Sequence, residues 1–311
     1  MATTLSSPFL ARPFTTLLRG VCMLGIIVSH ALSEYVEFLV RYRLTMVLDA
    51  GYFATGIFFC LSGYGITCSM QQHGVNGAFV WRHIRKLLLA YGVFWLFYVL
   101  LAVILGRELP LVEWVWRFLT LRFPLADAWF FRTIVLLYLC YFALMRLTSK
   151  PTLWLSGLLV AYVAVLVVCG VSTWWWNTVL CFALGAIIAH RPIPSKPWPW
   201  YYLLVLAVLW GMCYKVFPIV EVSKVVAPLL LCVLVVGVSQ RWVGCKLPVL
   251  SFMGTHSIYC YFMAAIPEDF IAARHLSAVL YVGSVLAITL ALSYLAHKLV
   301  ERGLRLIGKP K

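Results

Sequence analysis

The sequence predicts an all-α, polytopic membrane protein with about ten transmembrane helices and both termini in the cytoplasm. Hydrophobic residues make up 64% of the 311-residue chain, and charged residues make up only 11%. The mean hydropathy of +0.96 excludes an ordinary soluble domain. Because apolar stretches recur along the whole sequence, we expect one integral membrane domain over residues 1–311 and no soluble extracytoplasmic domain.

Short segments with ordinary turn residues separate the apolar stretches. Examples are His73–Gly77, Ser149–Pro151 and the proline-rich run Pro192–Pro199. The first stretch contains an arginine and a histidine, so we interpret it as a retained span and not as a cleaved signal peptide. The expected spans cover residues 14–38, 46–70, 84–105, 128–147, 152–170, 174–189, 200–217, 222–239, 251–273 and 277–299.

The distribution of charge predicts the orientation of these spans. With ten spans, the whole formal net charge of +15 falls on the side that holds both termini, where Glu301 is the one acidic residue. The positive-inside rule makes this side cytoplasmic, and an odd number of spans would mix the charges. The basic residues of this face are Arg12, Arg19, Arg82, Arg85, Lys86, Arg146, Lys150, Arg191, Lys196, Arg241, Lys246, Lys298, Arg302, Arg305, Lys309 and Lys311.

The first span carries the strongest functional signal, a basic residue at each end of the segment Arg19–His30. In a helix these two residues share one face and lie about 16 Å apart along the axis, roughly half the thickness of a hydrocarbon core. An ionisable side chain within a membrane helix is costly and indicates a functional site. The alternative is a histidine that only hydrogen-bonds a neighbouring helix.

Two further segments contain residues suited to binding. Ser62 and Gly63 are small residues within an aromatic stretch, which favours either close helix packing or a bent backbone. The cluster Arg82–Lys86 precedes the third apolar stretch, and its two arginines share a helix face from which both can bind phosphate groups. A simple positive-inside anchor is the alternative for this cluster.

These motifs resemble those of the acyltransferase-3 family of integral membrane acyltransferases, which includes O-acetyltransferases of bacterial cell-surface polysaccharides. The Arg-x10-His signature of that family matches Arg19 and His30. Its Phe-Phe-x-x-Ser-Gly-Phe/Tyr segment matches Phe58–Tyr64, and its Arg-x-x-Arg motif matches Arg82 and Arg85. The resemblance keeps the order of the family's motifs.

The resemblance continues through the rest of the chain. Tyr91 follows the arginines at the expected distance, and Trp129–Phe130 matches a Trp-Phe pair that opens the fourth span. Ser257–Tyr259 is similar to the Ser-x-x-Ile-Tyr-Leu region, and Val300–Arg302 is similar to the closing Val-Glu-Arg-Pro. The departures suggest a divergent member: an alanine replaces the usual proline, the expected late histidine is absent, and a glycine replaces the final proline, at Ala90, around Phe262 and at Gly303.

The resemblance implies a reaction and its cosubstrate. An acyl-CoA, with acetyl-CoA as the first expectation, would arrive from the cytoplasm, and no cofactor would be bound permanently. Arg82, Arg85 and Lys86, together with Arg19, would hold its phosphates, and Ser62 would belong to the same donor site. His30 would act as general base on an acceptor hydroxyl or as a transient acyl carrier. The acceptor would be a cell-surface or lipid-linked glycan at a bacterial inner membrane.

Other candidates rest on geometry or chemistry alone. Glu34 follows His30 by one helical turn and would orient its imidazole, or it only marks the end of the first helix. Asp127 and Arg132 would pair beside Trp129 to shape the acceptor side, or they form a structural ion pair. The run Trp174–Trp176 is typical of an interfacial belt, with stacking on sugar rings as the alternative.

Two other classes of function remain open at this point. One is a transporter or exporter of a polysaccharide or small molecule, in which the buried arginine and histidine form a proton or substrate path. The other is a membrane sensor or assembly partner that has lost activity. We expect membrane lipids as partners, no nucleic acid and no metal, and the sequence leaves a homo-oligomer open. Because enclosed ionisable residues usually face the interior of a helix bundle, we expect Arg19 and His30 to line a cavity that is open at both faces.

Overall fold

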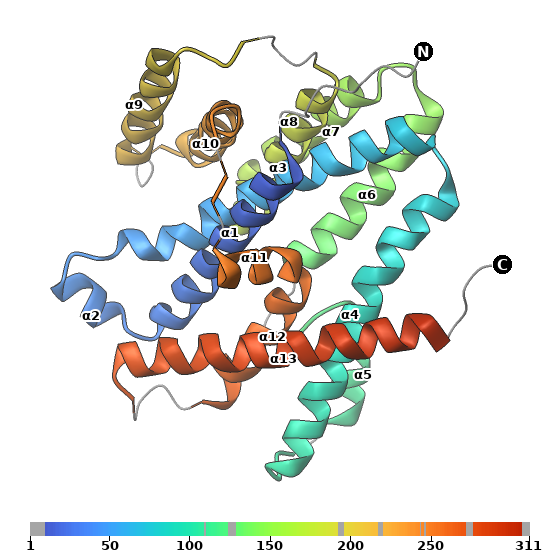
Figure 1. The fold of residues 1–311 in the computed structure, drawn as a ribbon, viewed down its shortest axis with the longest axis vertical. Coiled ribbons are helices and arrows are strands. Elements are labelled where there is room, and N and C mark those ends of the chain that lie inside the picture. The colour runs from blue at the N-terminus through green and yellow to red at the C-terminus, as the bar shows by residue number, and fades with distance from the viewer. Residues whose placement is uncertain are drawn as a thin grey trace.

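The structure is a computed structural model that describes residues 10–108, 110–123, 129–191, 196–216, 220–242, 244–245, 247–271 and 276–306. Within these ranges all regular secondary structure is helical (Figure 1). The helices are α1 (Arg12–Ser33), α2 (Val36–Arg41), α3 (Met46–His73), α4 (Gly77–Ile104), α5 (Leu111–Leu119), α6 (Trp129–Leu147), α7 (Pro151–Val168), η1 (Thr173–Trp175), α8 (Leu180–Ala189), α9 (Trp200–Val216), α10 (Ser223–Ser239), α11 (Pro248–Thr255), α12 (Ser257–Phe270) and α13 (Ala278–Leu306).

Length and composition confirm an all-helical membrane protein. Among the described residues, six helices are long and apolar enough to cross a membrane, namely α1, α3, α4, α6, α7 and α13. Helices α11 and α12 form a seventh candidate, a broken span bent by 95°. Three further apolar segments are shorter, namely residues 173–189, α9 and α10. Each of the ten predicted spans therefore has a helical counterpart, while the crossing by the short segments, and with it the count of ten, stays a prediction.

The structure differs from the sequence-based boundaries at three places. The first predicted span divides into α1 and the short α2, because the helical geometry is lost at Tyr35 (φ −121°, ψ 39°). The predicted span 251–273 breaks at His256, where the chain turns from α11 into α12. Helix α4 begins earlier than expected, at Gly77, because the side chain of Asn76 accepts a hydrogen bond from the Ala78 N–H (2.9 Å) and caps its first turn.

Helix α5 is an element that the sequence analysis did not predict. It is amphipathic: Trp114 packs against Trp95 and Tyr98 of α4, with ring centroids 6.1 Å and 5.6 Å apart. Its other face leaves Val112 and Trp116 largely exposed. The helix is too short to span a bilayer, so its apolar face fits a position along the membrane surface.

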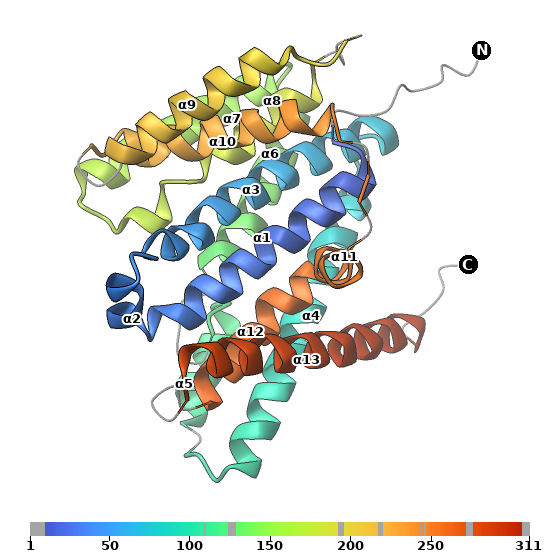
Figure 2. The same cartoon turned by 60° about the vertical axis from the view of Figure 1, so that its left-hand side comes forward.

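Helices α1 and α3 form the centre of the bundle and run side by side (Figure 2). Helix α8 packs on α3, α11 packs on α1, and α12 packs on α13. Helices α9 and α10 pack together on the far side of the bundle from α13 in both views, and α10 also contacts α3 and α8. The start of α1 and the end of α13 lie on the same side in Figure 2. We call this side, where Arg82, Arg85 and Lys86 also begin α4, the basic end.

Glycines allow the central helices to approach closely. A Cβ atom on Gly63 of α3 would overlap the carbonyl oxygen of Phe182, and one on Gly185 of α8 would overlap the carbonyl oxygen of Cys60. A Cβ atom on Gly254 of α11 would likewise overlap the backbone of Thr16 in α1. Because backbone atoms cannot move aside as side chains do, these positions fix the α3–α8 and α1–α11 crossings.

We predict that Gly185→Ala lowers the stability of the purified protein by about 1–3 kcal/mol, since the added methyl group forces α3 and α8 apart. Gly157→Ala is the matched control, because nothing lies within 4 Å of a Cβ atom at this position in α7. Thermal unfolding in detergent should show a lower midpoint for the first variant and no loss for the second. Equal midpoints would mean that the α3–α8 contact is not as close as described.

Candidate functional site

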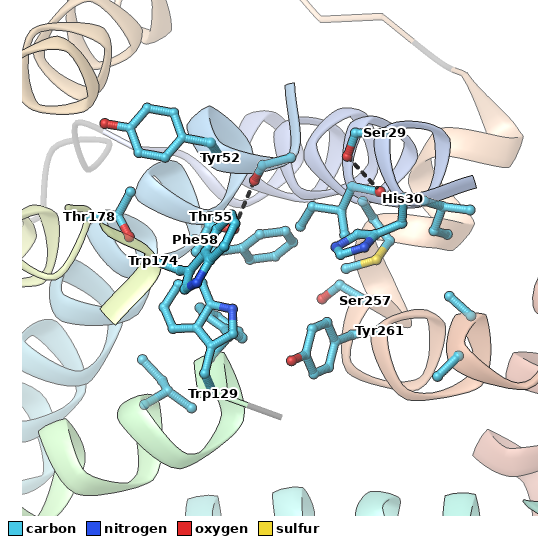
Figure 3. Close-up of a pocket in the computed structure, with 18 of the residues that line it drawn as sticks. Ser29, His30, Tyr52, Thr55, Phe58, Trp129, Trp174, Thr178, Ser257 and Tyr261 are labelled. Carbon is cyan, nitrogen blue, oxygen red and sulfur yellow. Dashed lines mark hydrogen bonds between the residues drawn. The ribbon is translucent and has the colours of Figure 1, made fainter. Parts of the chain in front are cut away.

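A cavity of about 690 Å³ opens between the central helices (Figure 3). Its lining combines apolar side chains with a small number of polar ones, as is common for binding sites. The polar lining residues, counting tyrosine and tryptophan, are Arg19, Ser29, His30, Ser33, Tyr52, Thr55, Ser62, Trp129, Tyr138, Trp174, Asn177, Thr178, Ser257, Tyr261 and Glu268. They come from α1, α3, α6, α12 and the segment that leads into α8.

The structure confirms the expectation that Arg19 and His30 line one cavity. The packing of α1 on α3 sets this orientation, because Ser29 lies against Gly51 and is buried there, with its hydroxyl donating to the Ile26 carbonyl (2.9 Å). The next residue, His30, then faces the cavity. The side chains of Arg19 and His30 have no hydrogen bond or ion pair within the described part of the chain. Both groups are therefore available to a ligand.

The lining near Arg19 belongs to the half of the cavity toward the basic end. Tyr138 of α6 lies near enough to Arg19 and Ser62 for their side chains to interact. Ser62, a predicted donor-site residue, thus lines the cavity in the same region as the arginine. Leu87 extends this part of the wall to α4.

The basic cluster of α4 lies next to the cavity and not on its wall. Arg82, Arg85 and Lys86 are exposed to solvent, and none of them is a lining residue. Lys86 immediately precedes Leu87, which does line the cavity. The structure therefore places the predicted phosphate-binding residues outside the cavity, exposed near the start of α4 at the basic end.

Helix α12 supplies polar groups on the histidine side of the cavity. Figure 3 shows Ser257 and Tyr261 beside His30. Glu268 also lines the cavity, and its carboxylate has no hydrogen bond or ion pair in the described residues. The sequence analysis missed Tyr261 and Glu268. An acidic residue inside an apolar span was the available signal for Glu268.

The other predicted site residues have different outcomes. Trp129 lines the cavity, whereas Arg132 does not and lies over the ring of Trp175, 5.0 Å from its centroid. Asp127 lies outside the described residues. Glu34 is exposed and is not a lining residue; it stands at the C-cap of α1, one residue after the helix ends at Ser33. Glu34 is instead near enough to Glu268 for their charges to interact.

The arrangement supports proton transfer next to an anion-binding group. An imidazole free of internal hydrogen bonds can accept a proton from a substrate hydroxyl, and a guanidinium can bind phosphate or stabilise developing negative charge. Among the described residues no group of three His, Cys, Asp or Glu side chains could hold a metal ion. The fold and this cavity define a multi-pass integral membrane protein with an open cavity in which a chemical or transport step can take place.

Comparison with known proteins distinguishes an enzyme from a transporter. A family model described as an acyltransferase domain, that of the acyltransferase-3 family, matches residues 13–298. The chain belongs to this family and is a membrane acyltransferase by that membership. No curated protein and no solved structure matched the chain.

The cavity arginine and a structural arginine should respond differently to substitution. Arg107 forms an ion pair with Asp269 (2.8 Å), which is itself largely buried, and lies over the Phe270 ring. We predict that Arg107→Met lowers the stability by about 1 kcal/mol or more, since it leaves the Asp269 carboxylate without its cation. Arg19→Met should leave the thermal midpoint unchanged or raise it, because no described partner loses an interaction. A large loss of stability in Arg19→Met would identify Arg19 as a structural residue.

Proposed function

We propose that the protein is an O-acyltransferase that moves an acyl group, acetyl in the first instance, from cytoplasmic acyl-CoA to a hydroxyl of a cell-surface or lipid-linked glycan. One observation carries the proposal: Arg19 and His30, both without internal partners, line the same membrane-embedded cavity of an acyltransferase-family chain. Maintaining two ionisable side chains in an apolar bundle is costly, which supports a role for both in function.

The donor is proposed to enter at the basic end, which the positive-inside rule assigns to the cytoplasm. Coenzyme A carries its phosphates at one end and its thioester at the other. Arg82, Arg85 and Lys86 present exposed cations at the basic end, where bound phosphates would remain hydrated in part. The pantetheine arm is flexible and can follow the wall from Leu87 toward Arg19 and Ser62. This path leads the thioester toward His30.

The proposed chemical step occurs at His30. The imidazole accepts the proton of the acceptor hydroxyl as its oxygen attacks the thioester carbonyl carbon. The C–S bond then breaks, and the proton on the imidazole returns to the departing coenzyme A sulfur. The products are an O-acyl ester and free coenzyme A, and the histidine is regenerated. Direct transfer needs no covalent intermediate, and a transient acyl-histidine is the alternative route.

The far end of the cavity is proposed to receive the glycan. Helix α6 ends near the start of α4, where Phe142 lies 3.7 Å from a Cβ atom placed on Gly77. Trp129, at the start of α6, therefore lies at the end opposite the basic end. A single cavity that reaches from Leu87 to Trp129 allows the donor and acceptor to meet at His30 from opposite sides. We propose a bacterial inner membrane as the location.

We predict that His30→Ala loses at least about 100-fold in kcat while its affinity for acetyl-CoA stays within a few-fold of wild type, because the substitution removes the base and leaves the phosphate contacts. Acetyl-CoA binding by calorimetry and release of free coenzyme A thiol, both in nanodiscs, measure the two effects. A variant with normal turnover would exclude His30 as the base. Failure of wild type to bind any acyl-CoA would contradict the acyl-CoA proposal and favour a transport function.

The Arg82→Ala/Arg85→Ala double variant should weaken acetyl-CoA binding by about tenfold or more, since two charge-assisted contacts to phosphate are lost. Raising the salt concentration should weaken binding by wild type and have less effect on the variant. Lys150→Ala/Arg191→Ala is a control with the same change of charge, because both of its residues are exposed and neither lines the cavity. Equal affinities in the two double variants would show that Arg82 and Arg85 act only as topological anchors.

A further inference from the structure

We infer that the cavity contains a subsite for an uncharged sugar ring, formed by Trp129, Trp174, Asn177 and Thr178 opposite His30. This inference rests on the proposed function, and it specifies the chemistry of the acceptor. Figure 3 shows Trp129, Trp174 and Thr178 on one side of the cavity and His30, Ser257 and Tyr261 on the other. A ring bound on the tryptophan side would present a hydroxyl toward the histidine.

The three consecutive tryptophans have three different environments, which argues against a uniform interfacial belt. Trp176 is buried, and its indole N–H donates to the Val171 carbonyl (3.0 Å). Trp175 lies under Arg132, and its backbone carbonyl accepts from the Tyr162 hydroxyl (3.1 Å). These contacts fix the segment, and Trp174 alone of the three lines the cavity, with 61% of its surface exposed.

The two residues that follow provide polar groups that the protein does not satisfy. Asn177 and Thr178 are 6% and 0% exposed, and both line the cavity. The Asn177 Oδ1 and Thr178 Oγ1 atoms have no hydrogen-bond partner among the described residues. A buried polar atom without a partner costs about 1–3 kcal/mol, which a ligand hydroxyl would recover.

Other hydroxyls of the same wall are already engaged. The Thr55 hydroxyl donates to the Gly51 carbonyl (2.8 Å), and the Tyr52 hydroxyl donates to the Lys224 carbonyl. The Asn177 Oδ1 and Thr178 Oγ1 atoms therefore differ from the neighbouring hydroxyls of Thr55 and Tyr52, which are satisfied within the protein. This difference indicates where a ligand would donate its hydrogen bonds.

The combination of groups specifies a sugar. The indole faces of Trp129 and Trp174 suit the apolar C–H face of a pyranose, while an amide oxygen and a hydroxyl suit its equatorial hydroxyls. None of the lining residues on this wall carries a charge, whereas the charged lining residues Arg19, His30 and Glu268 belong to α1 and α12. The Arg132 guanidinium lies over the Trp175 ring and does not line the cavity, so we assign the subsite to neutral sugars.

The test uses a defined probe, a long-chain alkyl glucoside that carries a photoreactive diazirine on its sugar ring. After irradiation of the full chain in nanodiscs, mass spectrometry should find the label on peptides that contain Trp129 or Trp174. Free methyl glucoside should compete with labelling, and methyl glucuronide should compete less. Labelling confined to lipid-facing helices, or equal competition by the charged sugar, would overturn the inference.

Two substitutions and a control make the test specific. Trp174→Ala should reduce the labelling about tenfold, and Trp174→Phe should retain part of it, because a smaller aromatic face remains. Trp154→Ala should label as wild type, since Trp154 is exposed on α7 and does not line the cavity. Equal loss in Trp174→Ala and Trp154→Ala would indicate nonspecific association of the alkyl chain.

Thr178→Val separates binding from folding. Valine has nearly the shape of threonine and removes the unpaired hydroxyl, so the thermal midpoint should hold or rise while labelling falls about threefold or more. A clear loss of stability would mean that the hydroxyl has a partner within the protein, and it would remove this support for the subsite.

The same samples distinguish this inference from the proposed function. Acetyl-CoA binding by Trp174→Ala and Thr178→Val should match wild type, because these residues lie away from the basic end. Specific labelling without acetyl-CoA binding by wild type would retain the sugar subsite and reject the acyl-CoA-dependent reaction. Acetyl-CoA binding and turnover without specific labelling would retain the transferase and reject the subsite.

Discussion

The cost of an ionisable side chain in an apolar bundle is the constraint on which the rest of the structure depends. Arg19 and His30 lie within a helix long enough to span a membrane, and neither has an internal partner among the described residues. Such groups are tolerated where they face a cavity or a ligand and not lipid. The bundle meets this requirement by surrounding one face of α1 with α3, α6 and α12 and leaving a cavity between them.

Close helix contacts and open space are consequently adjacent in this fold. Gly63 and Gly185 bring α3 and α8 together, and Gly254 brings α11 against α1. The chain then bends by 95° between α11 and α12, so that α12 leaves the direction of α11 and places Ser257, Tyr261 and Glu268 on the cavity wall. A straight helix over these residues would not combine the α1–α11 contact with this wall.

The cavity also combines two kinds of chemical environment along its length. Its basic end has exposed cations beside Leu87, which suit the phosphates of a soluble, anionic donor. The opposite end has indole rings and uncharged polar groups, which suit a ring with hydroxyls. His30 lies across the cavity from these indole rings, near the end of α1 away from the basic end. The proposed transfer would use this separation, with the donor held at the basic end and the acceptor at the opposite end.

The sequence by itself determined the class, the family and the Arg19–His30 face, because hydropathy and helical spacing are local properties. It also indicated Arg82 and Arg85 through their spacing. It did not reveal the break at His256, the cavity positions of Tyr261 and Glu268, or the separate environments of Trp174, Trp175 and Trp176. These depend on contacts between helices distant in the sequence, and an apolar span has nearly the same composition whether a residue faces lipid, protein or a cavity. Tertiary packing alone decided which polar groups meet and which remain unpaired.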